Sequence, residues 1–453
     1  MNRCLTALFT VSLAALAGNG HAENLVDIFE LAAKGDPLLL AAKAERDAVK
    51  EIGAQSRANY LPTIKANVTF TKLSEDIKSY TFLGQDYDSY LGRKPEETVL
   101  GRYLYENKGY SVTLSQPVFH MPNFANGRIA DAEQVKADVN YRIAQQDLLF
   151  RVAEHYYGVL ARIDDLNFAR GEKAAIAKQL DVTKKRFQVG LTAVTDVHEA
   201  QARHDLAAAR EVIAENELSH ARELLRDVTG ILHIDLLGLR ADMPFTPPTP
   251  SNIDDWTTAA RSQNLRIAVA QIEVEEAGYR VDKEKAAHYP TVDINGALGY
   301  NSYGYPFGAS DAQVASVTLD MNWTIYQGGR TASNIRQARS YGEVAKRNLE
   351  RTEREVLSET RNAFLGVLAS MSHVKALGQA VNSSAGAAKA TEAGFEAGTR
   401  SAIEVIDAKR EQVRAQRDYA STRYDYLLNT LRLKASVGLL TIDDLEQLNH
   451  WLE

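Results

Sequence analysis

One motif occurs twice in this sequence at a fixed spacing. "RFQVGLTAVTDV" begins at Arg186 and "GFEAGTRSAIEV" begins at Gly394, so equivalent positions lie 208 residues apart. "YYGVLA" at Tyr156 and "FLGVLA" at Phe364 repeat with the same offset. Such a duplication constrains the fold more than any single motif, because both halves must build the same arrangement of helices and strands.

Each copy is predicted to contain two strands, a very long helix, a glycine break and a second helix. Between the copies, "MPFTPPTPSN" is rich in proline, which disrupts helices and favours an extended connector. The first repeat is predicted to cover 23–243, with strands at about 62–73 and 109–119 and helices at about 123–189 and 193–232. The connector is predicted at 244–252. The second repeat is predicted to cover 253–453, with strands at about 290–300 and 314–325 and helices at about 330–397 and 401–437.

The strand regions alternate apolar and polar residues, as in Ile64, Ala66, Val68 and Phe70. Strands of a membrane barrel alternate in this way, and so do the half-buried strands of a soluble protein. Seventeen of the 36 aromatic residues fall in the two strand regions. Tyrosine and tryptophan gather at membrane interfaces, so this enrichment favours membrane strands. The segment from about Ser74 to Lys108 is predicted to be a long polar loop between the first two strands.

Four strands are too few to close a barrel. The smallest barrels have about eight strands, and an open edge in lipid leaves backbone groups without hydrogen bonds. Membrane strands in this chain therefore require a barrel shared between chains. Two, three or four copies would supply eight, twelve or sixteen strands, and the alternation does not choose among them.

The helical regions are unusually long. No proline occurs from Asn123 to Met243 or after Pro306. The 67 residues from Asn123 to Val189 would span about 100 Å as one helix. Apolar residues there step alternately by three and four, which is typical of a coiled-coil seam. The predicted seam is Leu149, Val152, Tyr156, Val159, Ile163 and Leu166, with Leu357, Thr360, Phe364, Val367, Met371 and Val374 in the same register of the second copy.

The first 22 residues are predicted to be a secretory signal peptide that is cleaved before Glu23. A positive start is followed by an apolar run and a small-residue cleavage site. The single cysteine, Cys4, lies within it, so the mature chain is expected to have no disulfide or cysteine-bound metal. Loss of Arg3 takes the formal net charge from −7 to about −8. An exported, mildly acidic chain lacks the basic surface that nucleic-acid binding needs.

The repeated motif is predicted to turn the chain at the tip of a helix hairpin. Gly190 and Gly398 follow the long helices, and glycine readily adopts the left-handed conformation at a helix end. Thr192 and Ser401 then stand where they can cap the next helix. Both copies therefore end in a tight turn about 100 Å from the strands.

Four segments of the sequence resemble the TolC family of outer-membrane efflux proteins: "AENL" after the signal peptide, "RFQVGLTAVTDV", "IYQGG" at Ile325 and "EAGFEAGTRSAIEVIDA" at Glu392. The resemblance covers essentially the whole mature chain. It implies a homotrimer in which a shared twelve-stranded transmembrane β-barrel, four strands per chain, continues into an all-α tunnel of long coiled helices.

The resemblance also implies a function and a location. The protein would be an exit duct for efflux or type I secretion in the outer membrane of a Gram-negative bacterium, extending through the periplasm and gated at its periplasmic end. Its implied partners are a periplasmic adaptor (membrane fusion) protein, an inner-membrane transporter of the RND, ABC or MFS class, and outer-membrane lipid. No cofactor or structural metal is implied, and the cargo stays open between drugs, peptides and protein toxins.

The family's gate positions carry over one by one. The residues implied as links between helices at the tip are Gln179, Thr195, Asp196, Glu392, Phe395, Arg400 and Arg423. Those implied to meet the adaptor are Phe187, Gly190, Leu191 and Gly398. Two positions depart from the family. Phe395 replaces a tyrosine and has no hydroxyl to donate to Asp196, and Glu404 is one methylene longer than the family's aspartate.

Glu404 and Asp407 are the residues implied at the pore constriction. They are three apart, so on a helix they share a face. Three chains would place six carboxylates around one opening, and such a ring favours cations and can bind a multivalent one as a block. For Glu404 a second interpretation stays open, because "SAIE" is also a capping box in which its carboxylate bonds the amide of Ser401.

Two other classes of function fit the sequence less well. An enzyme is disfavoured, because His198 and His204 are six apart and do not have the spacing of a zinc protease, and no nucleophile or phosphate-loop motif occurs. A soluble periplasmic coiled-coil adaptor, or a structural protein of an envelope-spanning complex, would share the signal peptide and hairpins. The barrel-like strands argue against that alternative.

Overall fold

The computed structural model describes residues 22–81, 96–305 and 308–453. The predicted signal peptide and Cys4 lie outside these ranges, apart from Ala22. The chain divides into two compact units. One comprises Met1–Glu45, Val139–Val269 and Glu350–Glu453, and the other comprises Arg46–Asp138 and Ala270–Leu349.

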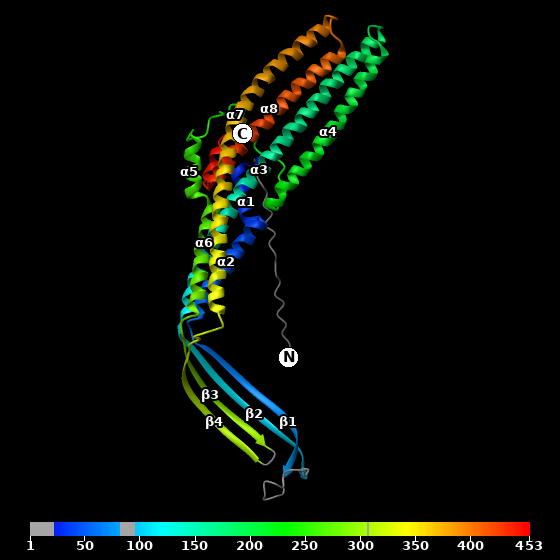
Figure 1. The fold of residues 1–453 in the computed structure, drawn as a ribbon. Helices are drawn as coiled ribbons and strands as arrows, with labels where there is room; N and C mark the ends of the chain where they lie inside the picture. Colours follow the sequence, from blue (N-terminus) through cyan, green and yellow to red (C-terminus); the bar gives the residue numbers. More distant parts are fainter. Residues whose placement is uncertain (1–21, 82–95, 306–307) are drawn as a thin grey trace, which may run out of the picture. The chain divides into compact units, whose positions relative to one another are not determined.

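The second unit contains one antiparallel sheet in the order β1-β2-β3-β4 (Figure 1). Its strands are β1 (Thr63–Thr81), β2 (Glu96–His120), β3 (Thr291–Tyr305) and β4 (Gly308–Asn322). The two repeats therefore contribute one hairpin each, and β2 pairs with β3 across the duplication. Within the described residues, the outer edges of β1 and β4 have no strand partner.

The strand register gathers the apolar side chains on one face of the sheet. Ile64 pairs with Leu114, and Val112 pairs with Leu298. Cross-strand partners share a face, while successive residues point to opposite faces. The apolar face consists of Ile64, Val68, Phe70, Tyr110, Val112, Leu114, Ile294, Leu298, Tyr300, Val317 and Leu319. In the single chain this face is uncovered, since Val68 is 81% and Val317 83% exposed.

The strands extend further than the sequence predicted. β1 continues to Thr81 and β2 starts at Glu96, so most of the expected loop from Ser74 to Lys108 is strand, and its centre lies outside the described residues. The polar residues here bond across the hairpin: Arg102 lies 3.0 Å from Asp76, and the Tyr105 hydroxyl donates to Glu75 at 2.7 Å. A segment whose residues are mostly polar is predicted as a loop from sequence alone. The same composition also suits a strand that has water on both of its faces.

The described residues include nine helices. They are α1 (Leu25–Gly35), α2 (Pro37–Ala58), α3 (Met121–Gln188), α4 (Val194–Thr229), α5 (Ile253–Gln263), α6 (Leu265–Ala286), α7 (Arg330–Glu396), α8 (Ala402–Val437) and α9 (Ile442–Asn449). The long pairs α3/α4 and α7/α8 lie close to the predicted ranges. Helices α1, α2, α5, α6 and α9 were not predicted. Each repeat begins with two of them before its strands, α1 and α2 in the first and α5 and α6 in the second. No helix in the described ranges has the length and apolar character to cross a membrane.

The predicted seam contributes to the core of the first unit, which contains most of the long helix pairs and is called the helical unit below. Val152, Tyr156 and Val159 are fully buried, as are Thr360 and Val367. Three seam positions, Ile163, Leu357 and Met371, are only partly buried. The Tyr156 hydroxyl donates to the backbone oxygen of Leu237 at 2.8 Å. The segment that contains Leu237 is therefore held against Tyr156 of α3, although the two are far apart in the sequence.

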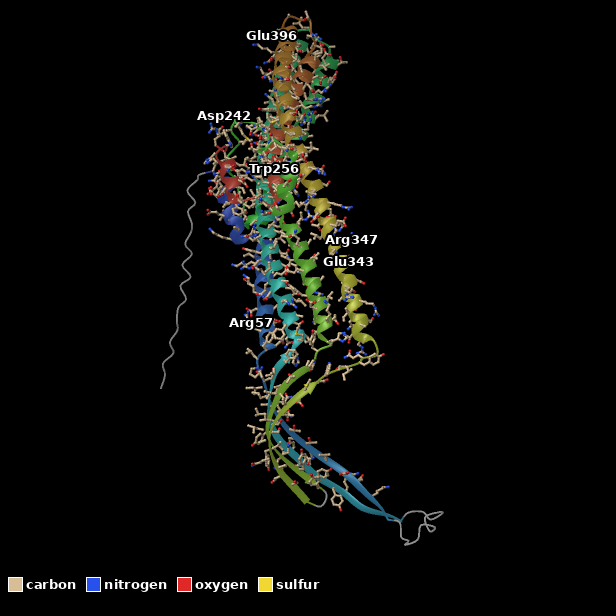
Figure 2. The ribbon with its side chains drawn as sticks, turned by 60° about the vertical axis from the view of Figure 1, so that its left-hand side comes forward. Arg57, Asp242, Trp256, Glu343, Arg347 and Glu396 are labelled. Carbon is tan, nitrogen blue, oxygen red and sulfur yellow. The ribbon has the colours of Figure 1, made fainter. Side chains whose placement is uncertain are left out.

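The proline-rich connector packs against α8. The Tyr426 hydroxyl donates to the backbone oxygen of Thr246 at 2.8 Å, and the Tyr426 and Phe245 rings meet edge to face at 5.2 Å. The indole of Trp256, which is labelled in Figure 2, donates to the backbone oxygen of Pro250 at 2.7 Å. The connector is irregular, as predicted, and these aromatic side chains fix its course.

Candidate functional site at the two hairpin turns

The first turn joins α3 to α4. Gly190 has φ +75°, and its amide donates to the Phe187 carbonyl at 2.9 Å. The Leu191 amide donates to the Arg186 carbonyl at 2.9 Å, which satisfies a second carbonyl at the helix end. α4 then begins without a side-chain cap, because Ala193 occupies the N-cap position. The predicted cap, Thr192, instead donates its hydroxyl to the Asp196 carboxylate.

The second turn repeats this backbone and adds a cap. Gly398 has φ +78°, and its amide donates to the Phe395 carbonyl at 3.1 Å. Ser401 is the N-cap of α8 and forms a full capping box with Glu404. The Ser401 amide donates to the Glu404 carboxylate at 2.7 Å, and the Glu404 amide donates to the Ser401 hydroxyl at 3.3 Å. The predicted Ser401 cap is therefore present.

Buried side chains tie the two hairpins together near the turns. One cluster comprises Ile176, Leu180, Ala200, Ala207 and Ile406, from α3, α4 and α8. Another consists of Phe395, Ala402 and Val405, with Val182 of α3 packed against it. The turns are neighbours in Figure 1, with Glu396 near the end of the second hairpin in Figure 2.

Phe395 has a partner that the sequence analysis did not identify. The guanidinium of Arg186 lies 4.0 Å from the centre of the Phe395 ring, and Arg186 also reaches the Phe395 carbonyl at 3.4 Å. A cation over an aromatic face is attracted by the ring's quadrupole. An α3-to-α7 contact therefore occurs at the position where the family resemblance implied a tyrosine hydroxyl.

Glu404 is fixed by its own turn. Besides the capping box, its carboxylate accepts a hydrogen bond from Arg400 at 2.7 Å. The bond from the Ser401 backbone amide, reinforced by Arg400 and the Ser401 hydroxyl, lowers the pKa of Glu404 from its ordinary 4.5 to about 2. The side chain is 44% exposed, so the capping role leaves the carboxylate in contact with solvent.

Asp407 faces the other hairpin. Its carboxylate lies 3.0 Å from Arg203 of α4 and 3.9 Å from Arg410 of its own helix. The two constriction residues predicted from sequence therefore both have a cationic partner within the chain. Arg203 carries no motif in the sequence and was missed.

The remaining predicted links are distributed along the hairpins. Asp196 and Arg400 do not pair with one another in the single chain, since Asp196 accepts from Thr192 and Arg400 donates to Glu404. Thr195 is exposed on the first turn of α4. Lys409, rather than Gln179, bonds Glu392, with its Nζ at 2.6 Å.

Gln179 and Arg423 lie further from the turns. The Gln179 side chain is buried, and its amide nitrogen finds no partner among the described residues. Arg423 donates to the backbone oxygens of Leu239 and Arg240 and so joins α8 to the chain just before the connector. Within the single chain, Arg423 is therefore not part of the turn cluster.

Two of the predicted docking residues, Phe187 and Leu191, belong to an exposed apolar tip on the first hairpin. Phe187 is 43% and Leu191 75% exposed, and Val189 and Val194 are uncovered beside them. Gly190 and Gly398 have open space where a side chain would project. Four uncovered apolar side chains at a helix end suit contact with another protein.

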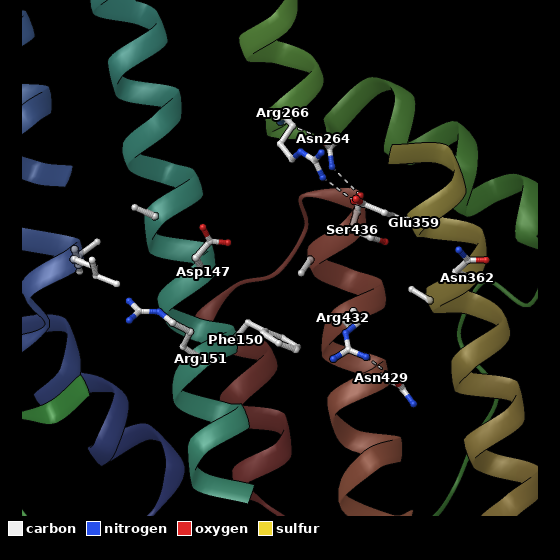
Figure 3. Close-up of a pocket in the computed structure, with 15 residues that line it drawn as sticks. Asp147, Phe150, Arg151, Asn264, Arg266, Glu359, Asn362, Asn429, Arg432 and Ser436 are labelled. Carbon is white, nitrogen blue, oxygen red and sulfur yellow. Dashed lines mark hydrogen bonds and ion pairs between the residues drawn. The ribbon is translucent and has the colours of Figure 1, made fainter. Parts of the chain in front are cut away.

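A groove of about 780 Å³ also lies in the helical unit, away from the turns (Figure 3). Two of its cations are in ion pairs, because Arg151 lies 2.7 Å from Asp36 and Arg266 lies 2.7 Å from Glu359. The third, Arg432, donates to the Asn429 side chain at 3.2 Å. Burial raises the pKa of Asp147 on its wall. The Ser436 hydroxyl on the same wall donates to the backbone oxygen of Leu433 at 2.8 Å, so it is bonded to its own helix.

Comparison with known proteins identifies the family. Residues 28–231 and 256–439 match the family described as "Outer membrane efflux protein". The chain belongs to the outer membrane efflux protein family. It is 32% identical to the outer membrane protein TolC of Vibrio cholerae, over 100% of this chain and 99% of that protein. It is 28% identical to the alkaline protease secretion protein AprF of Pseudomonas aeruginosa, over 98% of this chain and 91% of that protein.

Solved structures share the fold of this efflux family member. The outer-membrane channel OprN aligns with a TM-score of 0.73 at 19% identity, covering 91% of this chain and 89% of that one. The Campylobacter jejuni CmeC outer membrane channel aligns at 0.73 and 13% identity, covering 100% and 98%. The predicted fold class of long helices with four strands per chain is confirmed.

Family membership settles the class of function. The chain is an outer-membrane channel protein for export, not an enzyme and not a soluble adaptor. The alternative considered from the sequence is therefore wrong. Its relatives include outer membrane proteins of Gram-negative bacteria and two protease secretion proteins, so the chain acts in export at the outer membrane.

Proposed function

We propose that three copies of this chain form one exit duct. Each copy contributes its four-stranded sheet to a twelve-stranded barrel in outer-membrane lipid and its long helices to a periplasmic tunnel. The hairpin turns form the periplasmic entrance. Cargo from an inner-membrane transporter of the RND, ABC or MFS class passes through it, and a periplasmic adaptor seals the joint.

The sheet carries this proposal. It has an apolar face on which Val68, Leu298 and Val317 are more than 60% exposed, and its two outer edges have no strand partner in the described residues. Water would solvate the edges but not the face, and lipid would accept the face but not the edges. Pairing β4 of one copy with β1 of the next satisfies both requirements, because a closed ring of strands has no edge.

Assembly is tested by extracting the mature protein from outer membranes in detergent and measuring its mass. We expect a trimer that dissociates on heating and that conducts ions in a planar bilayer. A matched pair of substitutions locates the lipid face: Val317→Asp on the apolar face of β4 abolishes membrane assembly, while Thr318→Asp on the opposite face is tolerated. A water-soluble single chain without conductance contradicts the proposal.

We propose the hairpin turns as the gate. Glu404 and Asp407 line the constriction, and Thr195 and Asp196 of one copy meet Arg400 of the next. Glu392 and Phe395 tie helices within each copy, through Lys409 and Arg186, and Gln179 and Arg423 complete the links in the assembled duct. Phe187, Gly190, Leu191 and Gly398 meet the adaptor, which is supported by the exposed apolar tip.

Removing the proposed link between copies tests the gate. We expect Asp196→Ala combined with Arg400→Ala to raise the closed-state conductance. Exposed ion pairs stabilise by only about 0–1 kcal/mol each, so the closed state is held by a small free energy and the loss of one link shifts the gate towards the open state. Asp181→Ala combined with Lys185→Ala serves as the control, because it removes an exposed ion pair of 2.6 Å that lies within α3. Equal conductance in the double variant and the wild type refutes the link.

The cargo is tested in cells. Relatives include two protease secretion proteins and an outer membrane efflux protein from Brucella suis. Deleting the gene and measuring drug sensitivity and the secreted proteins separately distinguishes the two uses. Restoration by the full-length chain is required for either assignment.

A further inference from the structure

One ion pair joins the two hairpins of a single chain close to the proposed constriction. Arg203 on α4 lies 3.0 Å from Asp407 on α8. Arg203 also lies 3.7 Å from Glu199, one helical turn earlier, and Arg410 lies 3.9 Å from Asp407. The Arg203 side chain is 26% exposed. Half-covered charges in contact are screened by salt less than fully exposed ones.

Glu404 is compensated in a different way. Its cation, Arg400, is four residues earlier on the same hairpin. Any movement of the second hairpin carries both charges together. Asp407, in contrast, draws its nearest cation from the first hairpin, so the pairing depends on how the two hairpins lie against each other.

We infer that Arg203 determines the ion selectivity of the duct's entrance. Arg203 neutralises Asp407 while the hairpins are in contact, so three copies present an opening with far less net negative charge than six bare carboxylates. The closed entrance therefore binds multivalent cations weakly. This inference rests on the proposed function, since it requires Asp407 to face a shared opening.

The pair also couples charge to opening. An opening movement that shifts α4 against α8 breaks this pair and leaves Asp407 with Arg410 alone, at 3.9 Å. The entrance is therefore more negative in such an open state than in the closed state. Carboxylate rings favour cations, so the open entrance becomes the more cation-selective state.

Planar-bilayer recordings of the purified full-length oligomer test this inference, with La³⁺ as the probe. We expect Arg203→Gln to lower the half-blocking La³⁺ concentration at least about tenfold, equivalent to about 1.4 kcal/mol. Arg203→Lys keeps the positive charge and is expected to block like the wild type. Arg210→Gln is the matched control on the same helix, because Arg210 pairs with Glu172 inside the first hairpin at 2.7 Å.

Two further variants complete the test. Asp407→Asn removes the nearer of the two carboxylates beside Arg203, leaving Glu199 at 3.7 Å, and is expected to weaken the block below that of the wild type. Arg203→Gln combined with Asp407→Asn removes both charges and is expected to return the block close to the wild-type value. This double variant also keeps the inference testable if Arg203→Gln alone disturbs assembly.

The outcomes separate the two proposals. If the wild type conducts and Arg203→Gln leaves the La³⁺ block unchanged, the inference is wrong while the duct stands. The same holds if Arg210→Gln tightens the block as much as Arg203→Gln, because a general change of surface charge then explains the effect. A wild-type oligomer that does not conduct overturns the proposed function and this inference together.

Discussion

The two hairpin turns share a backbone and differ in chemistry. Both have a glycine with φ near +75° and the same pattern of amide-to-carbonyl bonds. At the first turn Phe187 is 43% exposed and Ala193 provides no cap, whereas at the second Phe395 is 7% exposed and Ser401 forms a capping box. The duplication thus preserved the geometry of the turn while one copy kept an uncovered apolar tip and the other became a packed support for carboxylates.

The largest expected difference is between the two equivalent phenylalanines. Phe395→Ala removes a buried ring and its contact with Arg186, so the free energy of local opening should fall by about 3 kcal/mol. Phe187→Ala removes an exposed ring and should change it by less than about 0.5 kcal/mol. Hydrogen–deuterium exchange of the amides at 394–406 and 186–198 measures both. Equal changes in the free energy of opening at the two turns would mean that the burial of Phe395 does not stabilise the second turn.

The glycines should behave alike. Gly190→Ala and Gly398→Ala each force a side chain into the left-handed region, at about 1–2 kcal/mol. Neither site has an atom within 4 Å of the added carbon, so the strain is purely that of the backbone. Gly386→Ala is the matched control in α7, where open space and helical backbone predict a gain of about 0.5–1 kcal/mol. Local exchange rates again give the measurement, and unequal losses at 190 and 398 would break the equivalence of the turns.

The caps can be exchanged between the turns. Ser401→Ala should destabilise the start of α8 by about 1 kcal/mol, and Ala193→Ser should stabilise the start of α4 by up to the same amount. The two substitutions are inverse, so each controls for the other in exchange measurements at the first helical turn. A loss at α8 without a gain at α4 would show that the Thr192–Asp196 contact already does the work of a cap.

The smallest expected difference is in pH dependence. The pKa of Glu404 is lowered from 4.5 to about 2, so its contribution is complete above pH 4.5 and is lost as pH falls towards 2. Exchange rates at the start of α8, corrected for intrinsic pH dependence, should therefore differ between the wild type and Glu404→Gln near neutral pH and converge in acid. The start of α4 provides the internal reference. A difference that persists unchanged at pH 2 contradicts the capping role.

Features that depend on local chemistry were predictable from the sequence. Gly190 and Gly398 end their helices because few other residues adopt the required φ, and the Ser401–Glu404 spacing is itself the capping signature. The seam around Tyr156 followed from its period. Signals for the missed helices were also present: Asn24 and Asp27 form a capping box at α1, and Pro37 occupies the first position of α2.

Features that depend on register between distant segments were not predictable. The extent of β1 rests on Arg102 meeting Asp76 across the hairpin, and polar residues of this kind indicate a loop when considered one at a time. Arg203 meets Asp407 only because two helix hairpins pack in one alignment, set by clusters such as Ile176 and Ile406. A change of one helical turn in that alignment would bring a different side chain to the carboxylate.

The open rims of β1 and β4 make a newly made copy hazardous to the cell. Until a neighbouring copy docks, each unpaired edge strand can pair with any extended chain, and the apolar side of the sheet promotes aggregation. Export, folding and meeting of the copies must therefore be closely timed. If too few copies are present to assemble, single copies are expected to precipitate in the periplasm before export through the duct falls measurably.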